Sequence, residues 1–418
     1  NVGIGKDALG SNTEGELNVG IGREALLNNT TGDSNVGVGR NALSNNTTAS
    51  NNTAVGDSAL NANTTASDNV AVGYFALGSN TTGAGNVAVG KRALDANTTA
   101  DNNTAIGKET LRTNTTGVGN TGVGYQALLL SSSGSGNTAV GRGALDANTT
   151  ADSNTAVGDF SLSANTTGTK NVAVGANALL ANTTGVSNTC FGYNAGGDTT
   201  TASYNTYIGE GCAVNGTTAG ANTGVGRLAL SALSTGGSNV AVGADALQSV
   251  TSGNNNVGLG LDAGRSNSPS GNITTGSNQI CLGNNSTTDL FCADTSISSS
   301  DSRDKTDVTN FNIGLAWINA LRPVTYRWDR RTWYGTDEEP FGTPDGSKKR
   351  QRLHIGFLAQ EALEVEKANG YGDTKDNMLV CNLTEDEMSY GMKYERLVPI
   401  LVNAIKELST KVTALEAG

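Results

Sequence analysis

The fold is decided by a 17-residue unit, which has its regular form in NVAVGKRALDANTTADN, from Asn86 to Asn102. Its glycine, Gly90 in this unit, recurs every 17 residues from Gly5 to Gly260 without a slip. Self-similarity at a fixed period is typical of a solenoid, in which each repeat stacks on the next. The sequence therefore predicts an ordered β-solenoid over residues 1–283, and nothing in the repeated unit looks catalytic.

Alternating residues predict a short strand in each unit. Val87 and Val89 share one strand face, which we expect to point inward together with Leu94. Ala93 and Leu94 predict a second short element, and the Asn-Thr-Thr that follows favours a turn. Coils spaced about 4.8 Å apart would give a rod on the order of 80 Å long.

A coil with so few large side chains is expected to be underpacked as a single chain. Burying the Ala-Leu face against copies of the chain about a symmetry axis would supply the missing core. The Asn-[Val/Thr]-Ala-[Val/Ile]-Gly unit resembles the β-roll heads of trimeric autotransporter adhesins, which pack in this way. The units here are longer and carry an extra Asn-Thr-Thr loop. The resemblance implies a homotrimer.

Composition argues against several functions. The net charge is −11, and the one basic cluster, Lys348–Arg352, is short and is interpreted as a solvated loop, so we expect no nucleic-acid partner. No stretch reaches 18 apolar residues, so no membrane insertion is expected. The single histidine, His354, and the absence of Cys-x-x-Cys spacing argue against a metal site, and no cofactor is expected. The cysteines are interpreted as buried small side chains: Cys190, Cys212, Cys281, Cys292 and Cys381.

Two positions after each predicted strand vary freely, which indicates solvent exposure. One interpretation is a ridge that binds a host cell-surface receptor through aromatic contacts, and the alternative is a solvated face without a partner. Regular threonines also suggest an ice-binding solenoid, although they sit in turns. No acidic pair recurs, so a glycosidase groove in the rod is not expected. The candidate receptor contacts are Tyr74, Phe75, Tyr125, Phe160 and Tyr193.

The repeat period breaks after Gly260, because the next matching glycine is Gly283, with the first proline, Pro269, between them. All three tryptophans and four of the five prolines follow, which is typical of a globular core. We expect a junction at 284–300, a second domain at 301–393 and a helix at 394–418. Because the chain begins in mid-register, we also expect it to be the distal part of a longer protein, whose N-terminal part carries the attachment site.

Four motifs follow the break in order, beginning with a Ser-Asp-x-Arg-x-Lys spacing at 300–305. They are SSSDSRDK at 298–305, LRPVTYRW at 321–328, HIGFLAQE at 354–361 and YERL at 394–397. Together they resemble the intramolecular chaperone of endosialidases, the autocleaving C-terminal domain of phage tail spikes and fibres, over residues 300–418. The resemblance implies a small α+β domain that assembles as a trimer, guides folding of the fibre ahead of it and then cuts itself off.

The resemblance places the nucleophile at Ser300, its partner at Lys305 and the cleaved bond between Ser300 and Asp301. A lysine can take a serine proton only if desolvation leaves its amine neutral, and Ser-Lys pairs are known variants of the catalytic triad. Ser298 and Ser299 remain alternatives if the register differs. The alternative without catalysis is that this segment is a flexible serine-rich linker followed by solvated charged residues.

Apolar residues in the last segment are spaced 3, 4, 3, 4, 3, which is a heptad seam. A helix of this length is marginal alone, so it needs partners, and three parallel copies fit. The alternative is an amphipathic helix lying on its own domain. The seam residues are Val398, Leu401, Ile405, Leu408, Val412 and Leu415.

The sequence thus predicts a mainly β protein: a trimeric repeat β-solenoid (β-roll) shaft, a small α+β chaperone domain and a C-terminal coiled-coil helix. The expected function is a phage tail fibre of the virion that attaches to a cell surface, with self-cleavage as its only enzyme activity. A bacterial trimeric surface adhesin of the same construction is the nearest alternative.

Overall fold

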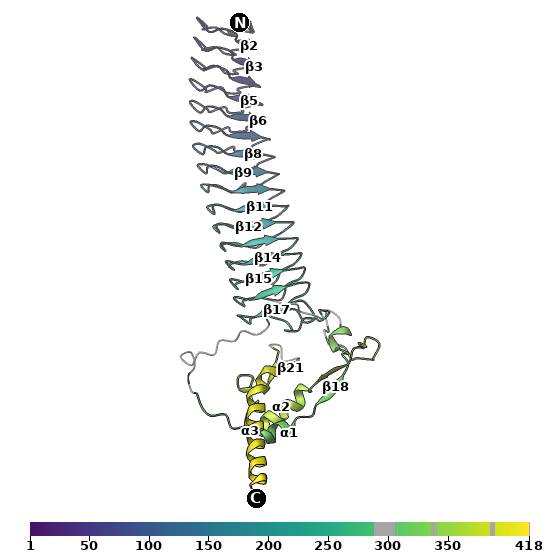
Figure 1. Ribbon diagram of the computed structural model, residues 1–418. Coiled ribbons are helices and arrows are strands. Elements are labelled where there is room, and N and C mark those ends of the chain that lie inside the picture. Colours follow the sequence, from purple (N-terminus) through teal and green to yellow (C-terminus); the bar gives the residue numbers. More distant parts are fainter. Residues whose placement is uncertain (288–305, 307, 336–338, 340, 385–388, 418) are drawn as a thin grey trace. The chain divides into compact units, whose positions relative to one another are not determined.

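The computed structural model divides the chain into two compact units (Figure 1). The first unit comprises Asn1–Ala263 and Thr274–Leu282, and the second comprises Gly264–Ile273 and Gly283–Gly418. The structure describes residues 1–287, 306, 308–335, 339, 341–384 and 389–417.

The first unit is a β-solenoid with one three-residue strand in each coil (Figure 1). Its 17 strands form one parallel sheet in which each strand pairs with its equivalent in the next coil, as Val87 pairs with Thr104. The strands are β1 Val2–Ile4, β2 Val19–Ile21, β3 Val36–Val38, β4 Thr53–Val55, β5 Val70–Val72, β6 Val87–Val89, β7 Thr104–Ile106, β8 Thr121–Val123, β9 Thr138–Val140, β10 Thr155–Val157, β11 Val172–Val174, β12 Thr189–Phe191, β13 Thr206–Ile208, β14 Thr223–Val225, β15 Val240–Val242, β16 Val257–Leu259 and β17 Ile280–Leu282.

The inward strand face is the opposite of the predicted one. The central residue, such as Ala88, is fully buried, whereas Val87 and Val89 face outward and are only partly buried. The interior has little room at this position: a Cβ added to the equivalent Gly37 would lie 3.1 Å from the Ala42 carbonyl oxygen. The Ala-Leu pairs are also buried within their own chain. The prediction that the Ala-Leu face packs against other copies of the chain is therefore wrong.

Only one of the two predicted elements is a strand. The Ala-Leu segment forms turns because Arg92 and Leu94 have φ angles of 56° and 51°, in the left-handed region that a strand excludes. The Leu94 N–H still donates to the Thr110 carbonyl in the next coil, at 3.1 Å. Gly90 has a φ of 135°, and a Cβ there would lie 2.4 Å from the Gly107 carbonyl oxygen. This close stacking explains the unbroken glycine period.

A first column of asparagines connects the coils and runs in steps of 17 from Asn1 to Asn256, and it is buried from Asn18 onward. Each amide oxygen accepts a hydrogen bond from the backbone N–H of the next asparagine, as Asn103 accepts from Asn120 at 2.9 Å. The Asn103 amide nitrogen donates to the Gly117 carbonyl at 2.9 Å. This column therefore satisfies backbone groups that water cannot reach.

A second column links side chain to side chain and is less regular. The Asn97 amide donates to Asn80 at 2.9 Å and to the Ala100 carbonyl at 3.0 Å, but Ala100 also accepts from Asn86 at 2.9 Å. No backbone group depends on Asn97 alone. The sequence accordingly replaces asparagine in this column, by Ser131, Thr199, Gly216, Leu233 and Val250.

The two columns should differ in their contribution to stability. We expect Asn103→Ala to lower the free energy of unfolding by about 1–3 kcal/mol more than Asn97→Ala, because only the former leaves a buried backbone N–H, that of Asn120, without an acceptor. Denaturant unfolding of the two variants measures the difference, and each serves as the volume-matched control for the other. Equal losses would contradict this assignment.

In one pair of neighbouring coils, small residues make room in the interior for a bulky one. Tyr207 stands where other coils have alanine, glycine or cysteine in the centre of the strand, and it is fully buried. The leucine positions of the two coils hold Gly196 and Ala213, and a Cβ on Gly196 would lie 3.1 Å from the Tyr207 ring. Burial raises the pKa of the nearby Cys212 to about 12, so its thiol stays neutral. Four of the five cysteines are buried as predicted, and Cys292 lies outside the described residues.

The first threonine of most repeats is used in stacking. The Thr81 hydroxyl, for example, donates to the Thr98 carbonyl at 3.0 Å. These hydroxyls bond to the neighbouring coil in the turns and do not form a strand face of the kind that ice binding would require.

The second unit is a small α+β fold with its own core. Two strand pairs are antiparallel, β18 with β19 and β20 with β21. Its elements are α1 Leu315–Ala320, β18 Val324–Tyr326, η2 Arg331–Trp333, β19 His354–Gly356, α2 Ala359–Ala368, η3 Lys375–Asn377, β20 Cys381–Leu383, β21 Tyr390–Met392, η4 Tyr394–Arg396 and α3 Leu397–Glu416. The core consists of Trp317, Leu321, Ala362, Leu363, Val380, Cys381, Leu397 and Ile400.

Candidate functional site

Three of the four C-terminal motifs converge in the second unit. Pairing of β18 with β19 joins the motif at 321–328 to the motif at 354–361, and Arg322 forms an ion pair with Glu361 across them. The Arg322 hydrogen bond holds the pKa of Glu361 below its usual value. The third motif contributes Tyr394, whose hydroxyl accepts from the Phe357 N–H at 3.2 Å. A Cβ on Gly356 would lie 2.5 Å from that hydroxyl, so the glycine makes room for it.

The predicted cleavage site lies outside the described residues. It comprises Ser300, Asp301 and Lys305, together with the alternatives Ser298 and Ser299. The Ser-Lys dyad therefore stays a prediction from the sequence.

A buried carboxylate organises the segment after α2. Glu366 is fully buried, and its oxygens accept backbone hydrogen bonds from Leu379 at 2.9 Å, Val380 at 2.7 Å and Cys381 at 2.7 Å. Charge-assisted bonds of this kind are stronger than neutral ones. Glu366 thereby fixes the start of β20 against the helix.

Replacing this carboxylate should destabilise the second unit. We expect Glu366→Ala to lower its free energy of unfolding by about 3 kcal/mol or more, because three backbone N–H groups lose their acceptor. The matched control on the same helix is Glu364→Ala, which removes an exposed pair with Lys367 and should cost less than about 0.5 kcal/mol. Thermal unfolding followed by tryptophan emission measures both, since every tryptophan lies in this unit. Similar effects for the two variants would refute the role of Glu366.

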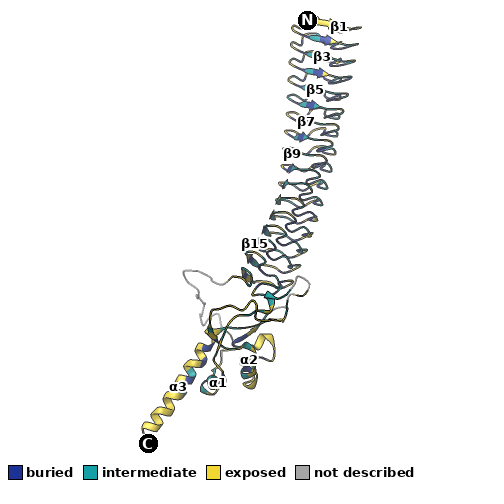
Figure 2. Ribbon diagram, turned by 90° about the vertical axis from the view of Figure 1, so that its right-hand side faces the viewer, coloured by how far each residue is buried: buried dark blue, intermediate teal, exposed yellow. Residues whose placement is uncertain are grey.

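The last helix, α3, has two apolar faces. Leu397, Ile400 and Ala404 are buried within the unit, and the Asn403 amide donates to the Phe311 carbonyl at 2.6 Å. The predicted seam lies on the adjacent face of the helix and is 43 to 82% exposed, as the extent of yellow on α3 in Figure 2 indicates. The helix does lie on its own domain, but through residues other than the seam. The exposed seam residues are Val398, Leu401, Ile405, Leu408, Val412 and Leu415.

Comparison with known families agrees with the motifs. Residues 300–371 match the family described as chaperone of endosialidase. The protein carries a chaperone-of-endosialidase domain. No curated protein and no solved structure matches the chain. A β-solenoid shaft followed by this chaperone domain is the construction of a fibre-like protein with an intramolecular chaperone.

The described part of the chaperone domain and shaft offers no metal site and no membrane span. Across the described ranges, no group of three or more His, Cys, Asp or Glu residues is placed to hold a metal ion. No described helix is both long enough and apolar enough to cross a bilayer.

The candidate receptor contacts on the shaft fall into two classes. Tyr74, Tyr125 and Tyr193 are 43 to 58% exposed. Phe75 and Phe160 are only partly exposed; a Cβ on the neighbouring Gly78 or Gly143 would lie within 2.7 Å of the respective ring, so both phenylalanines pack on the shaft. The three tyrosines are the better placed for contact with a partner.

The chaperone domain also holds a basic and aromatic wall, formed by residues 327–334 and 348–352, that the sequence pattern does not predict. The segment 348–352, before β19, is exposed, as expected for a solvated loop. However, the Arg350 N–H donates to the Trp328 carbonyl at 2.8 Å, and the Arg350 guanidinium lies 5.1 Å from the Trp333 ring centroid. Because β18 and β19 are antiparallel neighbours, the segment RWDRRTWY after β18 meets KKRQR before β19. The alternation of tryptophans and arginines in RWDRRTWY is the feature of the sequence that could have predicted this stacking.

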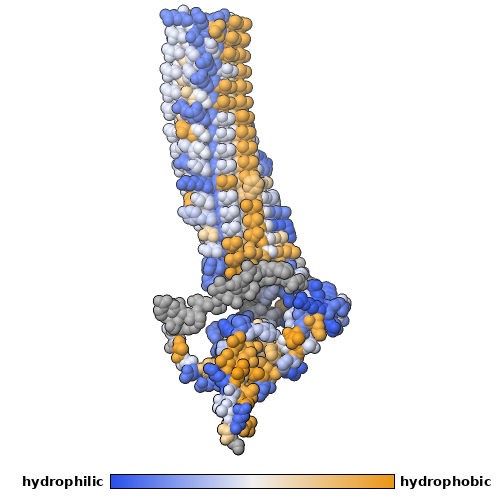
Figure 3. Space-filling model, viewed as in Figure 1, coloured by the Kyte–Doolittle hydropathy of each residue, from blue (hydrophilic) through white to orange (hydrophobic). Residues whose placement is uncertain are grey.

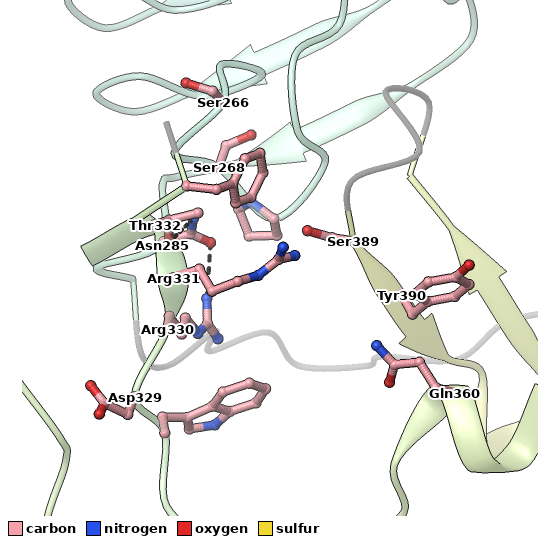
Figure 4. A pocket seen from close by; sticks show the side chains of 13 residues that line it. Ser266, Ser268, Asn285, Asp329, Arg330, Arg331, Thr332, Gln360, Ser389 and Tyr390 are labelled. Carbon is pink, nitrogen blue, oxygen red and sulfur yellow. Dashed lines mark hydrogen bonds between the residues drawn. The ribbon is translucent and has the colours of Figure 1, made fainter. Parts of the chain in front are cut away.

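Residues of this wall line two neighbouring cavities. The one in Figure 4 has a volume of about 380 Å³ and includes Arg331, Gln360 and Tyr390 in its lining. Asn285 is part of the lining of both this cavity and a second one, and it is hydrogen-bonded to Arg330 and Thr332, at 2.9 Å each.

Proposed function

We propose that the protein is a homotrimeric fibre, such as a phage tail fibre, whose shaft attaches to a cell surface and whose chaperone domain drives trimerisation and then cleaves itself off. The observation that carries the proposal is that both the shaft and α3 leave long apolar surfaces exposed. A bacterial trimeric adhesin with the same parts would present the same surfaces.

On the shaft, the exposed surface is the outward column at the end of each strand. This column is apolar in every coil, and in the coil with Phe191 that ring is 52% exposed. Figure 3 shows an apolar stripe running along the shaft. Soluble monomers rarely expose continuous apolar patches of this extent, so copies of the chain are the natural cover. The column consists of Ile4, Ile21, Val38, Val55, Val72, Val89, Ile106, Val123, Val140, Val157, Val174, Phe191, Ile208, Val225, Val242, Leu259 and Leu282.

On α3, the seam continues for about five turns with heptad spacing, which favours a parallel coiled coil. The face with Ile400 is already buried within the domain, so the seam is free to pack against the α3 helices of two other copies. An isolated helix with such a seam would be marginally stable.

A charge in the seam should prevent assembly. We expect Ile405→Glu to shift the full chain from trimer to monomer or to aggregate, because three buried carboxylates would meet near the axis. Lys406→Glu, on an exposed neighbouring position, should remain trimeric. Analytical ultracentrifugation measures the mass of each variant. A monomeric wild-type chain, or a trimeric Ile405→Glu variant, would argue against the assembly.

Self-cleavage is proposed from the family resemblance of the segment at 300–305. Lys305 would need burial to lose its proton and act as the base for Ser300. If that burial arises only when three chains pack around Lys305, cleavage reports that the fibre has folded.

Cleavage should separate the chaperone domain from the shaft at one bond. Mass analysis of the purified wild-type protein is expected to show a fragment that begins at Asp301, and Ser300→Ala should abolish it by removing the nucleophile. Ser298→Ala is the control and should still cleave. If the Ser300→Ala variant gives the same fragment, Ser300 is not the nucleophile. If only Ser298→Ala loses cleavage, the nucleophile is Ser298.

A host cell-surface receptor is the proposed partner of the shaft, with Tyr74, Tyr125 and Tyr193 as candidate contacts. Their support is their exposure beside a fixed repeat frame. The virion tail, or a bacterial surface in the alternative, is the proposed location.

A further inference from the structure

A second cavity beside the wall is rich in cationic groups. Its volume is about 300 Å³, and it opens between the strand β19 and the segment after β18. Three arginines and one histidine line it, and none of its lining residues is a carboxylic acid. The lining residues are Asn285, Thr287, Trp328, Arg330, Trp333, Arg350, Arg352 and His354.

The arginines of this cavity are held in place by aromatic rings. The Arg330 guanidinium lies 4.3 Å from the centroid of the Trp328 ring, and Arg350 lies over Trp333. Arg330 also donates to the Asn285 amide oxygen at 2.9 Å. Stacking on a ring uses the face of a guanidinium and leaves N–H donors at its edge free for a ligand.

The charges in the cavity are not balanced by the described residues. Burial lowers the pKa of Arg330, and the like charge of Arg350 lowers it further. Neither arginine forms an ion pair with a carboxylate among the residues that the structure describes. An anion bound between two neighbouring cations, one of them partly desolvated, would offset their mutual repulsion and the cost of desolvation.

We propose that this cavity binds an oxyanion, a phosphate or carboxylate group, through Arg330 and Arg350. Planar guanidinium groups match the paired oxygens of such anions and form charge-assisted hydrogen bonds with them. The two tryptophans, each stacked on one of these arginines, supply apolar lining. Phosphate and carboxylate share this recognition chemistry, so the experiment has one arm for each.

Tryptophan emission of the full chain provides the test. Trp328 and Trp333 line the cavity, whereas Trp317 is buried in the core and gives a constant background. Inorganic phosphate in one arm and acetate in the other are titrated at constant ionic strength, with chloride as the balancing anion. We expect a saturable change in emission in at least one arm. Arg350→Gln should weaken the binding at least about 10-fold, because it removes a charged hydrogen-bond donor.

Lys349→Gln is the matched control, because it removes the same charge from the neighbouring residue, which does not line the cavity. It should bind like the wild type. Saturation by phosphate alone assigns a phosphate site, and saturation by acetate alone a carboxylate site. The proposal is overturned if the wild type shows no saturable change, or if Arg350→Gln binds as well as Lys349→Gln. The wild-type titration decides by itself if Arg350→Gln fails to fold.

Discussion

The hydrogen bond from a backbone N–H to the asparagine amide of the preceding coil is the interaction on which the shaft depends. It joins Asn120 to Asn103, and its equivalents join every coil from Asn1 to Asn256. Both groups are buried, so each coil must bring this backbone N–H back to the amide oxygen of the preceding coil. A step of 17 residues meets this requirement, and the longer step after Asn256 meets it too, because the Gln279 N–H donates to the Asn256 amide oxygen at 3.0 Å. Where the step grows to 23, between β16 and β17, the strands still pair in register, and Gly264–Ile273 groups with the second unit.

Because the interior of each coil is filled, the larger apolar residues of the strand lie on the outer surface of the shaft. Ala88 and its equivalents take the space inside the coil, so the branched apolar residues of each strand end up outside. The helix α3 repeats this division, with Ile400 packed inward and Ile405 exposed. In both units, the apolar surface that a single chain cannot cover is long, narrow and regular. Such surfaces suit parallel copies of the same chain better than a compact partner.

The period of the sequence was enough to predict the solenoid and a short strand in each coil, because glycine, asparagine and the strand residues recur together. It was not enough to orient the strand. Alternation marks two faces, and Val87 and Ala88 differ too little in polarity to tell which one is inside; the size of the cavity decides. The pattern also did not reveal that Leu94 lies in a turn, because its left-handed conformation is rare for leucine.

In the second unit, motif order was sufficient to predict the chaperone domain and the final helix. The sequence did not reveal that Arg322 meets Glu361, or that Glu366 binds three backbone groups, since these contacts join segments far apart in the chain. The wall around Arg350 was missed for the same reason. From the sequence alone, this basic run is typical of a solvated loop. Only the pairing of β18 with β19 brings Trp328 and Trp333 beside Arg350.

Because successive coils are so alike, the shaft carries little information about which coil should face which in a neighbouring copy of the proposed trimer. A stagger of one coil, or of several, would keep almost every apolar contact along the stripe. Only rare departures from the pattern, such as Phe191 or the longer step before β17, mark a unique level. An array of this kind therefore needs its alignment to be set from outside the repeat, and a domain at one end of it is suited to that task.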